Sequence, residues 1–157
     1  TLLIQPVSRT RVYVEKLLSV MALLAMATLA IALGVVVSLI IISEHYAGGR
    51  LLAASVFTWL MTMGFGALAY SLGMATGKRG LSIGIATGYA FMTFIVASLA
   101  PAVDKLKPFE KLSLFYYYNS PNPAVAAVNW GHFAVLAGFI VISLVLGLVA
   151  FQRRDLA

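Results

Sequence analysis

The chain has 157 residues, of which 62% are hydrophobic and 10% are charged. Soluble domains carry about 25% charged residues, and a chain of this length cannot hide so much apolar surface from water, so a water-soluble globular protein is excluded. The absence of cysteine excludes disulfides, thiol chemistry and cysteine-based metal sites. The net charge of +6 is carried by residues between apolar runs, which favours lipid headgroups over nucleic acid as the partner.

Four runs without Asp, Glu, Lys or Arg are long enough to cross a bilayer. A helix needs about 20 apolar residues to cross roughly 30 Å of hydrocarbon. The runs are too long for barrel strands and do not alternate, so they are predicted to be helices. The expected fold is an all-α integral membrane protein with spans at 17–43, 51–77, 81–100 and 130–151.

A basic segment, residues 1–16, precedes the first span, and its charges predict the orientation. The positive-inside rule places the more basic side in the cytoplasm, so both termini, including the tail 152–157, are expected there. The cytoplasmic bases would be Arg9, Arg11, Lys16, Lys78, Arg79, Arg153 and Arg154, and those on the opposite side would be Arg50, Lys105, Lys107 and Lys111.

The second and third spans contain small and mildly polar residues. The pairs Gly73 and Gly77, and Gly84 and Gly88, have GxxxG spacing and are expected to pack these two spans as a hairpin. A polar substrate path is the functional interpretation of six further residues, and hydroxyl bonds back to the same helix are the plain alternative for its Ser and Thr members. These residues are Thr58, Thr62, Tyr70, Thr87, Tyr89 and Thr93.

The connection 102–129 is expected on the extracytoplasmic side and to contain a short amphipathic helix. After Pro108, apolar residues recur at helical spacing at Phe109, Leu112, Phe115 and Tyr116. An ordinary interfacial anchor without a gating role is the alternative. Asn122, before Pro123, can cap a helix that continues into the last span.

Two motifs resemble a known family. The opening TLLIQPVSRTRVYVEKLLSV is similar to the cytoplasmic element of ABC-2-type exporter permeases, which has Gly-Thr-Leu, a few apolar residues, Pro-Val-Ser-Arg and a lysine further on. The closing FQRRDLA, 151–157, is similar to the aromatic–Arg-Arg-Asp-Leu ending of many members. The matching residues of the opening are Thr1, Leu2, Leu3, Pro6, Val7, Ser8, Arg9 and Lys16.

The resemblance implies a transport subunit without its own ATPase activity. The four spans would be the last four of six, with two more upstream of Thr1. Residues 1–16 would lie next to the coupling helix, with Thr1 to Arg9 against a cytoplasmic ATPase subunit that holds ATP and magnesium; no cofactor is expected in this chain. A second permease subunit, identical or different, and a bacterial or archaeal plasma membrane are also implied, but the cargo is not.

Two other functions stay open. A structural or assembly subunit would use the glycine pairs for packing alone. A membrane-embedded lipid-modifying enzyme would need an acid–base or metal constellation, for which His45 and His132 are the candidates that the sequence offers. Within the spans themselves, no catalytic or metal-binding set is recognised.

Overall fold

The computed structural model describes residues 9–41, 48–119 and 129–153, and in these ranges the chain is helical, without strands. Four helices are long and apolar enough to cross a membrane, which confirms the predicted all-α membrane fold. They are α1 (Arg9–Ile41), α2 (Gly48–Thr76), α3 (Arg79–Leu99) and α6 (Trp130–Arg153). Between α3 and α6 lie the short helices η1 (Asp104–Leu106), α4 (Lys107–Glu110) and α5 (Leu114–Asn119).

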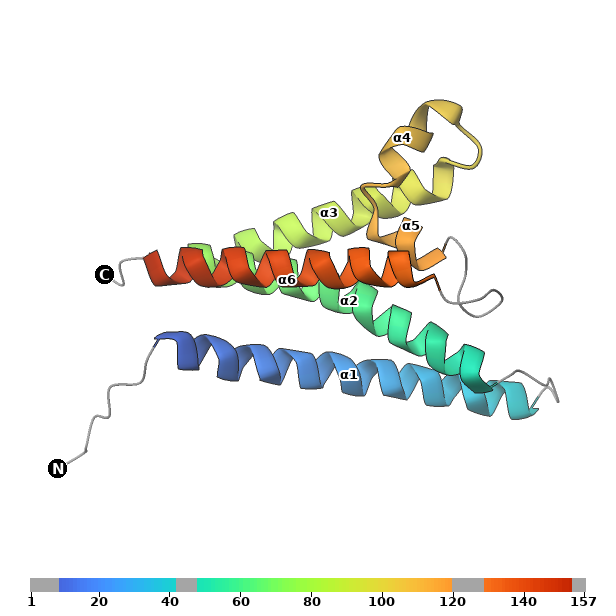
Figure 1. The fold of residues 1–157 in the computed structure, drawn as a ribbon, viewed down its shortest axis with the longest axis horizontal. Coiled ribbons are helices and arrows are strands. Elements are labelled where there is room, and N and C mark those ends of the chain that lie inside the picture. Colours follow the sequence, from blue (N-terminus) through green and yellow to red (C-terminus); the bar gives the residue numbers. More distant parts are fainter. Residues whose placement is uncertain (1–8, 42–47, 120–128, 154–157) are drawn as a thin grey trace.

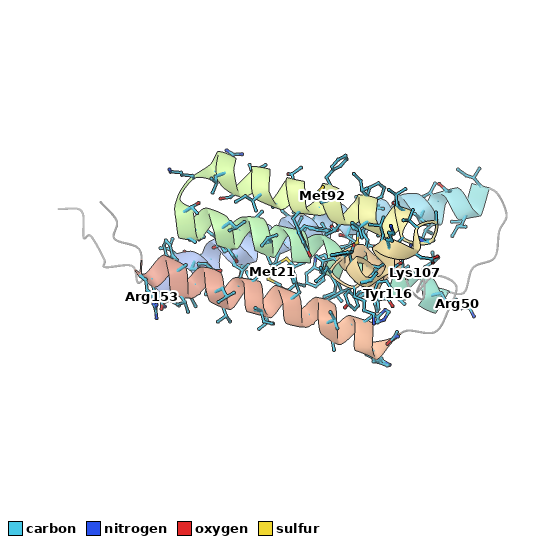
Figure 2. The ribbon with its side chains drawn as sticks, turned by 90° about the horizontal axis from the view of Figure 1, so that it is seen from above. Met21, Arg50, Met92, Lys107, Tyr116 and Arg153 are labelled. Carbon is cyan, nitrogen blue, oxygen red and sulfur yellow. The ribbon has the colours of Figure 1, made fainter. Side chains whose placement is uncertain are left out.

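Helix α2 is the centre of the bundle and packs against α1, α3 and α6 (Figure 1). We call the end where α1 begins and α6 ends the terminal end, and the end with η1, α4 and α5 the connection end. Figure 2 shows Arg153 at the terminal end and Arg50, Lys107 and Tyr116 at the other. Two clusters of basic residues are therefore separated by the length of the apolar spans.

The core lies mainly between α2, α5 and α6. Buried residues of α2 recur every three or four positions, which places them on one face of the helix. Leu114 of α5 packs into this core from the connection end. The core residues are Phe57, Leu60, Met63, Ala67, Leu114, Leu136 and Ile140.

Helices α2 and α6 approach each other closely at Ser71 and Gly147. A Cβ atom added to Gly147 would lie 2.5 Å from the Ser71 Cβ and 2.7 Å from the Ser71 Cα. No side chain fits there, so glycine lets the two backbones come together. This pair leaves no local pattern in the sequence, because its two members lie on helices far apart in the chain.

The predicted glycine pairs behave differently from one another. A Cβ atom at Gly73 would be 3.7 Å from the Ser82 Oγ of α3, an ordinary contact, and Gly77 ends α2 with a φ of 67°. At Gly84 and Gly88, nothing lies within 4 Å of such an atom. The expectation that the second pair packs the hairpin is therefore wrong within this chain: these glycines sit on an exposed face of α3.

The connection contains η1 and two short α-helices, α4 and α5, where one amphipathic helix was expected. Ser113 separates α4 from α5: its Oγ accepts a hydrogen bond from the Phe115 N–H at 3.2 Å, as a residue at the start of a helix does. Leu112 and Phe109 are 67% and 55% exposed, whereas Leu114 is buried. The predicted apolar stripe is therefore not one face of one helix.

Helix bounds also differ from the predicted spans. Helix α1 begins at Arg9, well before the predicted span at residue 17, because the basic segment continues the helix without a break. At α6, the Asn129 Oδ1 accepts a hydrogen bond from the Gly131 N–H at 2.9 Å and caps the helix. The expected cap at Asn122 falls outside the described residues.

Candidate functional site

The coupling residues expected from the resemblance lie at the edge of the described structure. Arg9 is the first residue of α1. The others lie outside the described residues: Thr1, Leu2, Leu3, Pro6, Val7 and Ser8. The structure therefore defines the point at which this segment joins the bundle.

That point is a junction of three helices at Tyr13. The Tyr13 hydroxyl donates to the Leu144 carbonyl oxygen of α6 at 2.8 Å, and the Tyr70 hydroxyl of α2 donates to the Tyr13 carbonyl oxygen at 2.6 Å. The Tyr13 side chain is 2% exposed. Its ring meets the Tyr70 ring edge to face at 5.0 Å and the Phe151 ring at 6.1 Å. We call these four residues the Tyr13 junction.

A second contact joins the same helix ends at the surface. The Gln152 Nε2 donates to the Thr10 Oγ1 at 3.3 Å. The first turns of α1 are thus tied to the last turns of α6. From the sequence alone, Tyr13 is expected at the membrane interface. Its helical spacing to Leu17 and Met21, which pack against the core, is the signal that could have placed it inside the bundle.

The substrate-path candidates on α2 lie at two places along the helix. Thr58 donates to its own helix, at the Ala54 carbonyl oxygen, over 2.8 Å, and lies 3.4 Å from the Tyr118 hydroxyl of α5. Thr62 donates to the Thr58 carbonyl oxygen at 2.8 Å. Tyr70 belongs to the Tyr13 junction near the terminal end.

The candidates on α3 also differ in their surroundings. The Tyr89 hydroxyl donates to the Leu112 carbonyl oxygen at 2.8 Å. The Thr93 hydroxyl bonds back to the Tyr89 carbonyl oxygen at 2.8 Å, while the Thr93 carbonyl oxygen accepts from the Ser113 Oγ at 3.0 Å. Thr87 lies on the exposed face of α3.

The six candidates therefore do not line one continuous path within the described part of this chain. Three of them (Thr58, Tyr89 and Thr93) meet the segment that contains α5, and they do so through Tyr118, Leu112 and Ser113. Ser113 is fully buried. These contacts hold the connection against the connection end of the bundle, where α5 packs between α2, α3 and α6.

Aromatic rings complete this closure. The Phe115 ring lies 5.5 Å from both the Phe65 ring of α2 and the Phe94 ring of α3. At the start of α6, the His132 ring meets the Tyr117 ring edge to face at 5.2 Å. Within the described residues, no group of three or more His, Asp or Glu side chains could hold a metal ion.

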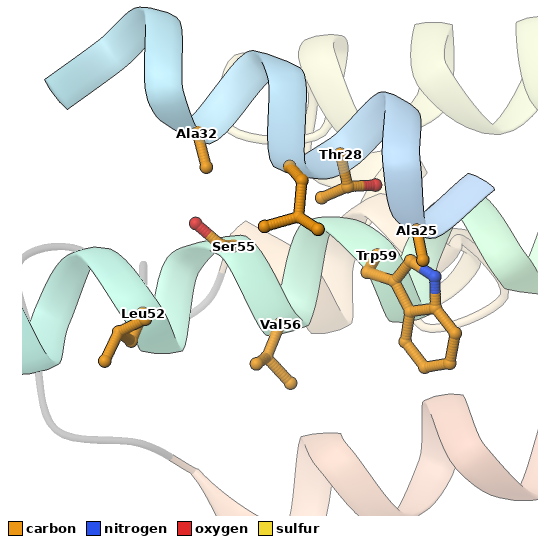
Figure 3. Close-up of a pocket in the computed structure, with 8 residues that line it drawn as sticks. Ala25, Thr28, Ala32, Leu52, Ser55, Val56 and Trp59 are labelled. Carbon is orange, nitrogen blue, oxygen red and sulfur yellow. The ribbon is translucent and has the colours of Figure 1, made fainter. Parts of the chain in front are cut away.

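A small apolar groove of about 230 Å³ lies between α1 and α2 (Figure 3). Trp59 forms one end of it, with Ala25 and Thr28 of α1 opposite. The Thr28 hydroxyl is bonded to the Leu24 carbonyl oxygen at 2.8 Å, whereas the buried Trp59 Nε1 has no hydrogen-bond acceptor among the described residues. The surroundings can hold hydrocarbon but offer no reactive group.

Four apolar helices, with basic residues confined to their ends, define a multi-pass membrane protein. The family model described as ABC-2 family transporter protein matches residues 1–156, and the chain belongs to this family. It is accordingly a membrane permease component of ABC transporters, which transports and is not itself an enzyme. No curated protein and no solved structure matches the chain.

Proposed function

We propose that this chain is the transmembrane subunit of an ATP-driven exporter, with both termini in the cytoplasm and residues 1–8 in contact with a separate ATPase subunit. Family membership supports the transport role. The excess of basic residues at the terminal end supports the orientation. In this proposal the ATPase subunit holds ATP and magnesium. A second permease subunit completes the transporter, which lies in a bacterial or archaeal plasma membrane.

The observation that carries the proposal is the Tyr13 junction. Residues 1–8 lead directly into α1, and Tyr13 binds this helix to the main chain of α6 while Tyr70 of α2 binds to Tyr13. Bonds to main-chain oxygens connect whole helices rather than flexible side chains. A push on the N-terminal segment by the ATPase is therefore passed to α2 and α6 together.

At the connection end of the same helices, α5 closes the bundle. Helix α5 packs against α2, α3 and α6, and Leu114 is part of the core. A tilt of α2 and α6 at the terminal end would thus change the packing around α5 about one span away. Opposite ends of one bundle would then open in turn, which is the requirement of alternating access.

Purification of the full-length protein from its native membrane in mild detergent tests the proposal, with mass spectrometry of the copurifying chains. We expect a stoichiometric polypeptide that contains a P-loop, GxxxxGK[ST]. An intact complex that lacks such a polypeptide would overturn the proposal. A variant with both Pro6→Ala and Arg9→Gln should keep its helices but transport poorly, and full transport by that variant would remove the contact role of residues 1–9.

A further inference from the structure

A groove with a volume of about 480 Å³ runs over one face of α2 near the terminal end. Its floor consists of small residues of α2, including Gly66, Ala69 and Gly73, and of Gly77, which follows α2. Val20 and Leu24 of α1 form one wall. Ser82 and Ile83 of α3 form the other, so the groove is bounded by α1 and the first turn of α3.

The groove is as deep as one leaflet and is crossed by a side chain at its inner end. From Gly77 to Gly66 the helical rise is about 16 Å, and one leaflet contributes half of the roughly 30 Å of hydrocarbon. At Gly66, the Leu24 Cδ1 lies 2.9 Å from the position of an added Cβ, so Leu24 reaches the floor there. A transmembrane helix of another polypeptide would need a groove that continues past Leu24. An acyl chain that enters from one leaflet would not.

The groove walls have no hydroxyl group that needs a partner from a ligand. The Tyr70 hydroxyl, which is at the groove, is bonded to the Tyr13 carbonyl oxygen at 2.6 Å. The Ser82 Oγ is bonded to the Lys78 carbonyl oxygen at 2.9 Å. Apart from Arg79, the other side chains of the lining are apolar and suit a hydrocarbon chain.

The mouth of the groove is basic. Arg79 lines it, and Lys78 is the adjacent residue. On α1, Lys16 is four residues before Val20 and so lies on the same face, one turn nearer the terminal end. All three side chains are exposed and have no ion-pair partner among the described residues.

Among the residues that the structure describes, no acidic side chain balances these charges. Glu15 is the nearest in sequence, and it is paired with Arg11 at 2.8 Å. The other described acidic residues, Asp104 and Glu110, belong to the connection at the opposite end. Each base near a membrane surface attracts anionic lipid by about 1 kcal/mol, or about fivefold in affinity.

We propose that this groove binds an anionic phospholipid, with one acyl chain along the glycine floor and the phosphate at Lys16, Lys78 and Arg79. The small residues of α2 thus make room for a lipid chain as well as for the neighbouring helix. If the orientation proposed above is correct, this lipid belongs to the cytoplasmic leaflet. The groove and its basic mouth do not depend on that orientation, so the lipid site can be tested even if the exporter proposal fails.

The test is native mass spectrometry of the full-length complex after delipidation and return of either phosphatidylglycerol or phosphatidylcholine. We expect retained phosphatidylglycerol in clear excess over phosphatidylcholine. A variant with both Lys78→Gln and Arg79→Gln should bind phosphatidylglycerol about 25-fold more weakly. Gly73→Leu, which extends a side chain into the groove, should also lose it; the Cβ itself is tolerated, because its nearest neighbour is at 3.7 Å.

The matched control removes two bases at the other end, Arg50→Gln and Lys111→Gln, and should leave this binding unchanged. Equal retention of the two lipids would overturn the proposal, and so would unchanged binding in both groove variants. A cysteine at position 73 that forms a disulfide with a second copy of the chain would also overturn it, since a protein would then occupy the groove. The two side chains replaced in the double glutamine variant are exposed, so this variant should fold normally. Its result therefore tests the proposal even if Gly73→Leu fails to fold.

Discussion

The Tyr13 hydroxyl donates a hydrogen bond to the Leu144 carbonyl oxygen over 2.8 Å and joins two residues 131 positions apart in the chain. The bond links the beginning of α1, the helix that follows residues 1–8 in the chain, to α6. The tyrosine ring meanwhile packs between Tyr70 and Phe151. The two contributions of this residue, polar and apolar, can be separated by substitution.

Tyr13→Phe removes the hydroxyl and keeps the ring. The loss of one hydrogen bond should cost about 1 kcal/mol of folding stability. If the junction transmits force, cargo transported per ATP hydrolysed should fall while ATP hydrolysis by the complex continues. Both rates can be measured in proteoliposomes.

The control is Tyr116→Phe, at the connection end, where the tyrosine contacts other rings without a hydroxyl bond to the described residues. That variant should keep the original ratio of transport to hydrolysis. Equal ratios in the wild type and Tyr13→Phe would show that the Tyr13 bond has no part in coupling.

Gly147→Ala tests the contact between α2 and α6. The added methyl would fall 2.5 Å from the Ser71 Cβ, so the helices must move apart. Forcing an extra carbon into a close contact costs about 1–3 kcal/mol. The melting temperature in detergent should fall accordingly.

Gly138→Ala is its control on the same helix, because nothing lies within 4 Å of that position. This variant should melt near the wild-type temperature. Adding Ser71→Gly to Gly147→Ala should restore part of the loss, and the Ser71 Cα at 2.7 Å explains why recovery is incomplete. Equal melting of Gly147→Ala and Gly138→Ala would contradict the close packing.

The sequence predicted the class and the spans well because long apolar runs have few alternatives in a membrane. It did not predict the Tyr13 junction, since a tyrosine near a basic segment has the same pattern whether it lies at the headgroups or inside. The GxxxG spacing likewise does not reveal whether another helix is present: Gly73 has Ser82 nearby, and Gly84 has open space. Contacts between residues far apart in sequence, such as Ser71 with Gly147, leave no local periodic signal.

Ser113 illustrates the same limit on a smaller scale. The apolar stripe from Phe109 to Tyr116 favours one continuous helix through Ser113, but the Ser113 hydroxyl bonds to Thr93 of α3 and caps α5 instead. Ser113→Ala removes both bonds and should destabilise the docked connection by about 1–2 kcal/mol. Hydrogen exchange should become faster in residues 114–119.

The control for this variant is Ser19→Ala, because the Ser19 hydroxyl is exposed and bonds only back to its own helix, at the Glu15 carbonyl oxygen. Exchange in α5 should not change there. Unaltered exchange in Ser113→Ala would mean that ring packing around Phe115, rather than the serine, holds the connection in place.

Cysteine substitutions separate a transport path from a purely structural bundle, since the chain has no cysteine of its own. Thr58 lies beside α5, 3.4 Å from the Tyr118 hydroxyl, and Thr62 lies one turn further along α2. If α5 opens during transport, Thr58→Cys and Thr62→Cys should react with a polar thiol reagent faster when ATP is being hydrolysed. Thr87→Cys, on the exposed face of α3, should react at a rate that hydrolysis does not change. Uniformly slow reaction at positions 58 and 62 in every state would instead favour the structural subunit, because a path that cargo crosses must at some stage admit water.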